Sequence, residues 1–476
     1  MQKGNVNTMV RVCRAIVATA LLGTLLVIVD ATTTTSAAYA TSVIVIDVGQ
    51  EHACAILSNG DLKCWGEGGS GRLGQGNTND IGDGAGEMGT NLAAIDLGTG
   101  RTAKAVAAGG SHTCAILDDD SVKCWGEGSS GQLGQGNTND IGDGGGEMGD
   151  ALNPVDLGTG RTAKWIDAAR AWSCAILDDD TLKCWGYNYY GQLGQEVSNN
   201  LGDGVGEMGD DMDPVDLGTG RTAQSVTGGQ YHICVVRDDD TVRCWGRNPY
   251  GQLGTGSAHH DGRGDDVGEM GDNLSNVNLG AGRTAKFIDA DSNQHTCAIL
   301  DDDTLKCWGR NNNSGQLGLG NKSNKLTPQT SPINVGTGRT VAEVATGDSV
   351  TCAILDDASL KCWGEGDSGR LGSGSTDDLG DESGEMGDDL DEVDLGTGRT
   401  AQAIASGDLA QFMCALLDDD TVKCWGQNNK GQLGQGNTTV LGDGGSEMGD
   451  NLAAVKLGAG FTLSTTTASV TEAGST

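Results

Sequence analysis

The stretch CAILDDDTLKCWG, residues 174–186, holds two cysteines ten positions apart around three aspartates, with a Trp-Gly directly after them. Nearly the same sequence returns at 114–126 and 297–309. The residues on the two sides of the aspartates match when the chain folds back at this tip, so the stretch predicts a β-hairpin with a three-residue loop. In this hairpin Cys174 faces Cys184, and Ile176 faces Leu182.

The last residue of such a loop adopts the left-handed backbone conformation. Gly60 stands at this place in the first copy, and an aspartate such as Asp180 stands there in most others. Both residue types tolerate that conformation better than most. Ala358 occupies the place in the sixth copy, and we expect local strain there.

The cysteine pair occurs seven times, at intervals of 55 to 63 residues, and with Cys13 the pairs account for all 15 cysteines. Opposed residues of a hairpin lie within reach of a disulfide. Each bridge closes a small loop and should stabilise the fold by about 2–3 kcal/mol in the chain-entropy model. A zinc site is not expected, because the close cysteine spacing of such sites is missing. The expected disulfide cysteines are Cys54 and Cys64, Cys114 and Cys124, Cys174 and Cys184, Cys234 and Cys244, Cys297 and Cys307, Cys352 and Cys362, and Cys414 and Cys424.

Two further segments accompany each hairpin: an apolar one before it, such as 103–110, and a second one, such as 153–161, after a long polar loop. No helical periodicity of useful length follows residue 40. Four short strands in each of seven units predict an all-β fold, a seven-bladed β-propeller of four-stranded blades over 41–462. Because each unit contains its own four strands, we expect the ring to close without strand exchange. The units start near residues 42, 102, 162, 222, 284, 340 and 400.

Residues 1–40 differ from the repeats. Arg11 and Arg14 precede an apolar run at 15–29, and small residues lead to the sequence AYA at 38–40. This pattern is typical of a secretory signal peptide, and the run is shorter than the roughly 20 residues of a membrane span. We therefore expect a secreted protein in an oxidising compartment, where disulfides persist. An uncleaved N-terminal anchor is the alternative. The tail at 463–476 is expected to be disordered.

The chain carries a net charge of −36, and removal of residues 1–40 would make it two units more negative. Such a surface repels phosphate backbones, which argues against DNA or RNA as a partner. The composition favours a basic or neutral protein partner, no membrane contact once the leader is removed, and a monomer. Solubility in a salty medium is an alternative reason for the acidity.

The Trp-Gly after each hairpin, the Gly-Gln/Arg-Leu-Gly that follows it, and a histidine before four of the hairpins resemble the repeat of the regulator of chromosome condensation family. The resemblance covers all seven units and implies a seven-bladed propeller. Members of that family exchange nucleotide on a small GTPase and bind chromatin, sense light, serve as modules of ubiquitin ligases, or inhibit other proteins outside the cell. No exchange-factor residues are matched here, and the light sensor's Gly-Trp-Arg-His-Thr signature is missing. The likeness thus concerns fold more than activity. The histidines are His52, His112, His232 and His295, and Trp172, Val350 and Phe412 replace them elsewhere.

The repeated residues have structural interpretations. The seven tryptophans are expected to pack between blades, and the histidines to bind backbone at the start of the second strand. No serine or cysteine nucleophile is placed to use these histidines, so we expect no enzyme. The aspartates of the hairpin tips should pair with arginines of the connections between units. Those arginines are Arg101, Arg161, Arg221, Arg283, Arg339 and Arg399.

Long loops rich in Gly, Asp and Asn, such as 76–91, follow the third expected strand. Each of six such loops has a glutamate followed by methionine, and we expect the methionine to fasten the loop to its blade. Their oxygen ligands would suit calcium, although the EF-hand register is not met. We expect no cofactor, with calcium as the alternative. The glutamates are Glu87, Glu147, Glu207, Glu269, Glu385 and Glu447.

Aromatic residues outside the repeat pattern gather in units three and four of a chain that has only 4% aromatics. Clusters of this kind are typical of protein-binding hot spots, although drift in permissive loops is an alternative reading. The sequence therefore predicts a non-enzymatic binding scaffold whose partner docks on the long-loop side of units three to five. The alternatives are an intracellular exchange factor or chromatin adaptor, and a hydrolase with a carboxylate pair at the channel mouth. The expected partner-binding residues are Trp165, Trp172, Tyr187, Tyr189, Tyr190, Tyr231 and Tyr250.

Overall fold

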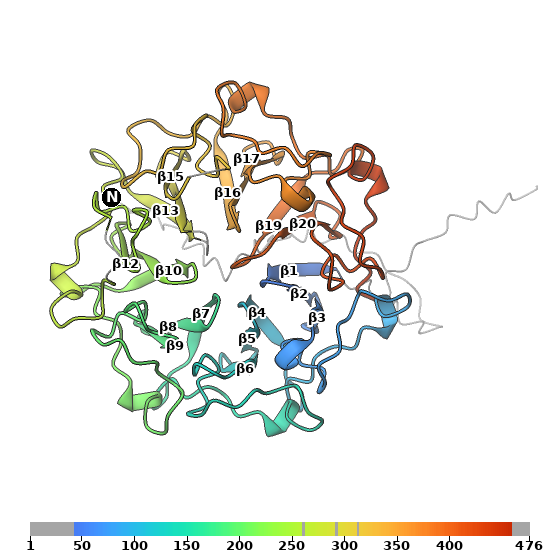
Figure 1. Cartoon of the computed structure of the whole chain (residues 1–476). Coiled ribbons are helices and arrows are strands. Elements are labelled where there is room, and N and C mark those ends of the chain that lie inside the picture. Colours follow the sequence, from blue (N-terminus) through green and yellow to red (C-terminus); the bar gives the residue numbers. More distant parts are fainter. Residues whose placement is uncertain (1–41, 259–261, 291–293, 312–313, 459–476) are drawn as a thin grey trace, which may run out of the picture.

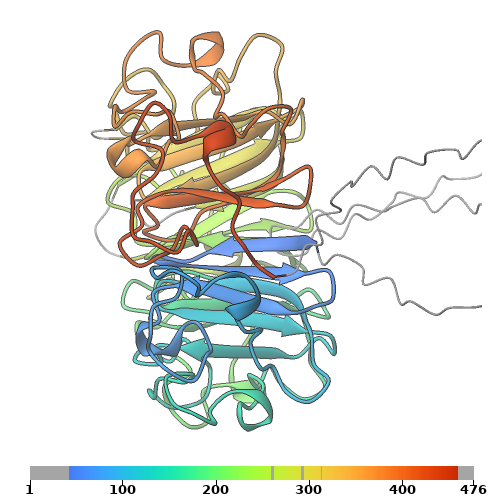
Figure 2. The same ribbon diagram turned by 90° about the vertical axis from the view of Figure 1, so that its right-hand side faces the viewer.

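A computed structural model describes residues 42–258, 262–290, 294–311 and 314–458. Within these ranges the chain forms seven antiparallel sheets of three strands each, set around a central axis as the blades of a propeller (Figure 1). The side view shows a disc with loops on both of its faces (Figure 2). The expected leader at 1–40 and tail at 463–476 lie outside the described residues.

Each blade runs outward from the axis in the order first, second, third strand. Blades 1 to 4 contain β1 (Val43–Val48), β2 (His52–Leu57) and β3 (Leu62–Gly66); β4 (Ala103–Ala108), β5 (His112–Leu117) and β6 (Val122–Gly126); β7 (Ala163–Ala168), β8 (Trp172–Leu177) and β9 (Leu182–Gly186); and β10 (Ala223–Gly228), β11 (His232–Arg237) and β12 (Val242–Gly246). Blades 5 to 7 contain β13 (Ala285–Ala290), β14 (His295–Leu300) and β15 (Leu305–Gly309); β16 (Val341–Gly347), β17 (Val350–Leu355) and β18 (Leu360–Gly364); and β19 (Ala401–Ala405), β20 (Phe412–Leu417) and β21 (Val422–Gly426).

The helices of the described residues are all short turns of 3₁₀ geometry in the loops, and none is long and apolar enough to cross a membrane. They are η1 (Gly69–Gly71), η2 (Gly89–Asn91), η3 (Gly149–Ala151), η4 (Gly209–Asp211), η5 (Gly271–Asn273), η6 (Asp367–Gly369), η7 (Gly387–Asp389) and η8 (Gly449–Asn451).

The expected fourth strand of each blade is not a strand in the structure. Its segment approaches the third strand through one backbone hydrogen bond, as where Ile95 N donates to the Leu62 carbonyl at 2.8 Å. Two residues later, the Leu97 carbonyl accepts a hydrogen bond from a side chain instead of from the third strand. Its donor is Lys123 Nζ of the neighbouring blade, at 3.0 Å. With that carbonyl occupied by an ammonium group, the pairing ends after a single bond, and the sheets have three strands.

The hairpin register is the one that the sequence predicts. Cys174 faces Cys184 and Ile176 faces Leu182, and the other six pairs of cysteines are opposed in the same way. Each pair is joined by a disulfide with Cα atoms 4.0–4.1 Å apart. The tips also take the expected left-handed conformation, with φ of 67° at Asp180 and 66° at Ala358. Alanine at that φ is strained, because its Cβ crowds the backbone.

Neighbouring blades are joined by the repeated tryptophans, which are fully buried as expected. Trp125 of blade 2 donates its indole N–H to the Arg72 carbonyl of blade 1 at 3.0 Å. The same bond closes the ring, since Trp65 of blade 1 donates to the Gln432 carbonyl of blade 7 at 3.0 Å, and these two blades lie side by side in Figure 1. The ring therefore closes by packing, without strand exchange. The other five bonds run from Trp185 to Gln132, Trp245 to Gln192, Trp308 to Gln252, Trp363 to Gln316 and Trp425 to Arg370.

The histidines also act between blades, which corrects the expectation of a backbone partner. His112 Nε2 lies 2.9 Å from the Ser173 hydroxyl of the next blade. That hydroxyl donates in turn to the Gln132 carbonyl at 3.0 Å, the carbonyl that already accepts from Trp185. Equivalent contacts join His52 to Thr113, His232 to Thr296 and His295 to Thr351.

Where the histidine is missing, the facing residue changes with it. Trp172 packs in the same buried cluster as Ile233, Val350 in the same cluster as Met413, and Phe412 in the same cluster as Ala53. Each interface at this level is thus either polar on both sides or apolar on both sides. A buried hydroxyl opposite an apolar ring would lose one of its hydrogen-bond partners, which is the physical reason for the matching.

We predict that Trp65→Phe destabilises the ring more than Trp125→Phe. Both variants lose an indole hydrogen bond in a fully buried site. The Arg72 carbonyl keeps the Thr113 hydroxyl as a donor at 2.9 Å, whereas the Gln432 carbonyl faces Ala53 and keeps no donor among the described residues. A buried carbonyl without a donor costs about 1–3 kcal/mol. Chemical denaturation of the two variants checks this difference, and equal losses would contradict it.

A second prediction concerns pH. Burial lowers the pKa of His112 and of His232 to about 3, whereas an unfolded histidine titrates near 6.5. As the pH falls below 6.5 the unfolded chain binds protons that the folded chain does not, so the free energy of unfolding falls towards pH 3. The double variant His112→Phe/Ser173→Ala recreates the Phe412–Ala53 pairing.

We expect this double variant to lose less free energy of unfolding between pH 7 and pH 4.5 than the wild type, measured by denaturant titration at both values. His232→Phe/Thr296→Ala, the matched change in blade 4, should flatten the profile in the same way. An unchanged pH slope in both variants would show that the histidines do not carry it.

Candidate functional site

The two faces of the disc are built from different segments. The turns between first and second strands, the residues after each Trp-Gly and the long loops share one face, where Glu67 N donates to the Glu51 carbonyl at 2.8 Å. We call it the long-loop face. The hairpin tips and the connections between blades share the other, where Asp118 N donates to the Thr102 carbonyl at 2.9 Å. We call it the crown face.

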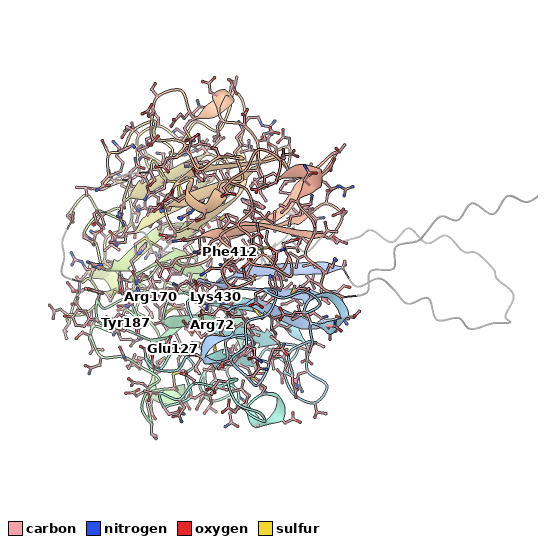
Figure 3. The ribbon with its side chains drawn as sticks, turned by 45° about the vertical axis from the view of Figure 1, so that its right-hand side comes forward. Arg72, Glu127, Arg170, Tyr187, Phe412 and Lys430 are labelled. Carbon is pink, nitrogen blue, oxygen red and sulfur yellow. A yellow bond between two sulfur atoms is a disulfide. The ribbon has the colours of Figure 1, made fainter. Side chains whose placement is uncertain are left out.

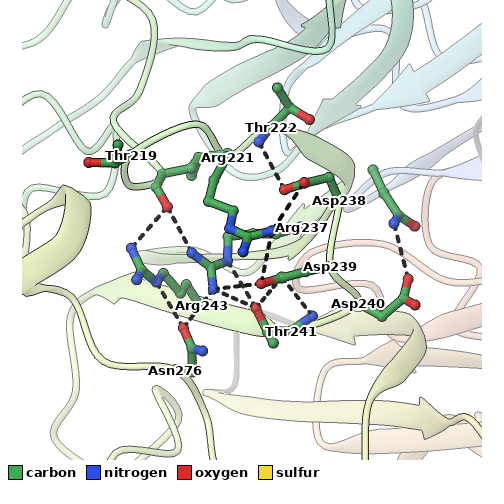
Figure 4. A network of polar contacts seen from close by, with 12 residues as sticks. Thr219, Arg221, Thr222, Arg237, Asp238, Asp239, Asp240, Thr241, Arg243 and Asn276 are labelled. Atoms are coloured by element: carbon green, nitrogen blue, oxygen red, sulfur yellow. Dashed lines mark hydrogen bonds and ion pairs between the residues drawn. The ribbon is translucent and has the colours of Figure 1, made fainter.

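The carboxylates of the crown face are paired within the propeller, as expected. Arg161 Nη1 lies 3.2 Å from Asp178 and 2.7 Å from Asp179. Blade 4 extends this network, because the nearly buried Arg237 donates to Thr241 and Asn276 beside the Arg221 pairs (Figure 4). Exposed ion pairs contribute little each, and the arginines of the crown face are already engaged by these aspartates. The same pairing is made by Arg101, Arg283, Arg339 and Arg399.

The glutamates of the long loops bind their own backbone. Glu147 Oε2 accepts from Gly142 N at 2.9 Å and from Gly144 N at 2.8 Å, and the corresponding glutamates of the other five loops do the same. Within the described residues, no group of three or more His, Cys, Asp or Glu side chains is placed to hold a metal ion. The following methionine packs against the core between blades, as Met148 does, so these loops are part of the framework.

A small cavity lies among the first strands near the middle of the ring. First strands of five blades line a cavity of about 20 Å³ there, close to the volume that one water needs. Its carboxylates are engaged, since Asp47 accepts from Ala108 N at 2.8 Å and Asp289 accepts from Thr346 N at 2.6 Å.

Two of the expected partner-binding residues are not on the binding face. Trp165 lines the central cavity. Trp172 is fully buried and donates to the Gly229 carbonyl at 3.0 Å. Trp165 lies in β7 and Trp172 begins β8, and a strand pattern in the sequence does not tell which aromatic residues face solvent.

Four of the tyrosines do come together, from the loops of blades 3 and 4. The rings of Tyr189 and Tyr190 lie 5.0 Å apart, those of Tyr190 and Tyr231 also 5.0 Å, and those of Tyr187 and Tyr231 6.0 Å. Edge-to-face contacts of this kind hold a cluster in one arrangement. Tyr189 is 64% exposed at the edge of the cluster, which makes it the most accessible of the large side chains there.

Arginines complete the cluster, and sequence reasoning missed them. The Arg247 guanidinium lies 5.0 Å from the Tyr190 ring and 5.5 Å from the Tyr231 ring, and Arg170 lies 6.0 Å from Tyr231. Further round the ring, Arg310 stacks on Tyr250 at 5.2 Å. The available signal was the position directly after Trp-Gly, where blades 1, 2 and 6 have glutamate and blades 4 and 5 have arginine. We call these eight residues the Tyr–Arg sector: Arg170, Tyr187, Tyr189, Tyr190, Tyr231, Arg247, Tyr250 and Arg310.

A hollow of about 340 Å³ lies between this sector and blade 2. Arg170, Tyr187 and Tyr231 line one part of it, and Glu127 with three serines lines another. Figure 3 shows Glu127, Arg170 and Tyr187 on the same side of the ring. Burial raises the pKa of the Tyr187 phenol, which therefore stays protonated near neutral pH and can both donate and accept a hydrogen bond.

The fold and this surface define a β-propeller that presents a sector of aromatic and arginine side chains beside its axis. Models of the regulator of chromosome condensation (RCC1) repeat match residues 43–72, 103–132, 173–192, 223–252, 302–354 and 402–432. RCC1 repeats are therefore present in these segments of the propeller.

Individual relatives share the fold and differ in what they do. The ultraviolet-B receptor UVR8 of Arabidopsis thaliana is 29% identical over 71% of this chain and 68% of its own length. The human E3 ubiquitin-protein ligase HERC2 is 27% identical over 69% of this chain, which spans only 6% of the ligase. Among solved structures, yeast RCC1 (Prp20) bound to Kap60 has a TM-score of 0.58 at 16% identity, covering 77% of this chain and 78% of that one. Human WBSCR16 has a TM-score of 0.57 at 16% identity, with 77% and 84% covered. At these identities the structures establish the fold alone.

Proposed function

We propose that the protein is a secreted, disulfide-bonded scaffold that binds another protein through the Tyr–Arg sector and catalyses no reaction itself. The observation that carries the proposal is the gathering of four tyrosines and two arginines on one part of the long-loop face. Tyrosine and arginine are enriched among the residues that dominate binding energy at interfaces.

The rest of the surface supports this choice of site. The crown-face aspartates already have arginine partners, and the loop glutamates already cap their own backbone. A partner at either place would have to break contacts before it made new ones. The tyrosines, in contrast, offer ring edges and hydroxyls at low conformational cost, because each side chain has few rotatable bonds.

The absence of a catalytic role rests on how the candidate groups are used. His52, His112 and His232 are fully buried between blades, and burial holds the pKa of each below its ordinary value. They are engaged with hydroxyls of the next blade rather than with a nucleophile in a cleft. A general base needs access to a substrate proton, and these rings have none.

Secretion is supported by the leader pattern in the sequence and by the seven disulfides of the hairpins. Cysteines of intracellular proteins are mostly reduced. The relatives named above include a receptor and a ligase, so the shared repeat carries no single activity to this chain. An intracellular exchange factor or chromatin adaptor is the competing function, and the state of the cysteines separates the two.

The first test is capture of extracellular proteins by the purified propeller. We expect Tyr189→Ala/Tyr190→Ala to weaken capture of the partner at least about tenfold, since interface hot spots are each worth roughly 2 kcal/mol or more. Asn429→Ala/Lys430→Ala changes the same two positions of blade 7 and should leave capture unchanged. Equal capture by both variants and the wild type, measured by quantitative mass spectrometry, would exclude the sector.

The second test is thiol mapping of the native protein from its producing cells. We expect no alkylation of the hairpin cysteines before reduction and complete alkylation after it, because each pair is closed. Reduction should also lower the free energy of unfolding by about 2–3 kcal/mol for each bridge. Recovery of free hairpin thiols in untreated protein would favour the intracellular alternative.

A further inference from the structure

We propose that the Tyr–Arg sector receives an acidic, carboxylate-bearing segment of its protein partner. This inference rests on the proposed function and defines the chemistry of the partner. It runs against the simplest expectation from net charge, because a chain of −36 would be assigned a basic or neutral partner. The charge of the partner segment is inferred instead from the distribution of charged residues around the axis on the long-loop face.

The long-loop face is divided into two halves. On blades 1, 2 and 6 the residue after Trp-Gly is glutamate, at Glu67, Glu127 and Glu365, whereas on blades 4 and 5 it is arginine. Among the turns between first and second strands, blades 1 and 6 carry Glu51 and Asp348, blade 3 carries Arg170, and blade 5 carries Asp291. The negative charge of the chain is therefore unevenly spread over this face.

In the acidic half, every basic group of the inner ring is already neutralised. Arg72 is nearly buried and lies 2.5 Å from Glu67, Arg370 lies 3.1 Å from Glu365, and Lys430 lies 3.4 Å from Asp80. In blades 1 and 6 the arginine of the pair stands where the other blades have the glutamine of Gly-Gln-Leu-Gly, whereas blade 2 has Glu127 after its Trp-Gly and keeps that glutamine. They are internal supports of the fold and offer no free cation to a partner.

In the other half, the two central arginines have aromatic neighbours instead of carboxylates. Within the described residues, no carboxylate lies within ion-pair distance of Arg170 or Arg247. Arg247 stacks on Tyr190 and Tyr231, and its Nε is buried without a hydrogen-bond partner. Arg170 lies against Tyr231 and the side-chain oxygen of a reoriented Gln230 amide.

An arginine that lies near aromatic rings and has no carboxylate partner retains N–H donors for a ligand, because a guanidinium carries five of them. Its planar fork matches a carboxylate with two parallel hydrogen bonds. Because Arg247 is partly buried and lies against two rings, less free energy is lost when its bond forms. A basic segment would be repelled by the arginines. An acidic segment would form hydrogen-bonded ion pairs with them and pack its apolar atoms on the tyrosines.

The overall negative charge does not cancel this local attraction. At physiological ionic strength electrostatic interactions are screened over about 8 Å, so acidic residues across the ring act weakly on a carboxylate that touches Arg170 or Arg247, and Glu127 is the acidic side chain that lines the hollow beside Arg170. The hollow of about 340 Å³ beside Arg170, Tyr187 and Tyr231 accepts side chains of the docked segment. Net charge slows the approach of an acidic partner, and local contacts decide the affinity.

The test uses three fluorescein-labelled peptides of equal length: one that alternates Asp and Glu around a phenylalanine, its Asn and Gln counterpart, and its Lys counterpart. We expect the purified wild-type propeller to bind the acidic peptide at least about tenfold more tightly than the amide peptide in fluorescence anisotropy. Arg170→Gln/Arg247→Gln should abolish that preference, and Arg170→Lys/Arg247→Lys should keep part of it. Arg101→Gln/Arg161→Gln on the crown face should leave it unchanged.

Several results would overturn the inference. These are equal binding of the acidic and amide peptides, tighter binding of the lysine peptide, or a preference that survives Arg170→Gln/Arg247→Gln. A single-stranded DNA probe that binds as tightly as the acidic peptide would show a general anion site instead. Self-association in light scattering that the same variant abolishes would assign the acidic segment to a second copy of the chain.

The experiments distinguish failure of this inference from failure of the proposed function. If Tyr189→Ala/Tyr190→Ala abolishes capture of the partner while Arg170→Gln/Arg247→Gln does not, the sector binds a protein but not through carboxylates. Thermal unfolding of each variant alongside the wild type establishes that the fold is retained, and the crown-face variant supplies the matched control for the loss of two arginines.

Discussion

A tryptophan indole that donates to a carbonyl of the neighbouring blade recurs seven times around the ring. The acceptor is the backbone of the Gly-Gln/Arg-Leu-Gly turn, so the bond fixes the position of that turn and of the long loop that follows it. Burial of a large aromatic ring supplies the free energy, and the hydrogen bond supplies the orientation. These contacts therefore fix the positions of the loops that form the long-loop face, including the Tyr–Arg sector.

The disulfides and the tryptophans stabilise the structure at different levels. Each disulfide spans one hairpin and constrains the chain within a blade. Each tryptophan, and each histidine where present, joins one blade to the next. A three-stranded blade is small and buries little on its own, which explains why a protein of this design uses covalent links inside blades and buried polar contacts between them.

Because the blades repeat, a residue that differs from its equivalents in the other blades can be recognised. On the crown face arginines pair with aspartates in six blades, and in six of the long loops a glutamate binds its own backbone. The long-loop face departs from the repeat in blades 3 to 5, where tyrosines and arginines replace glutamate, serine and glutamine at equivalent positions. Since those replacements leave the inter-blade contacts intact, they change the surface without cost to the ring.

The sequence by itself determined the hairpin, its register, the left-handed tip at Ala358 and the number of units, because these depend on contacts between residues close in the chain. The number of strands in each sheet was overestimated, four against three. A lysine of the neighbouring blade occupies the carbonyl that a fourth strand would need. The sequence also placed Trp165 and Trp172 on the surface, because a strand pattern gives the alternation of side chains but not which side faces the next blade. Only the tertiary structure showed that Phe412 and Ala53, or His112 and Ser173, form matched pairs across blades, and that Arg170 and Arg247 stand among the tyrosines. Those residues are some 60 or more positions apart in most cases, and their proximity arises from the closure of the ring.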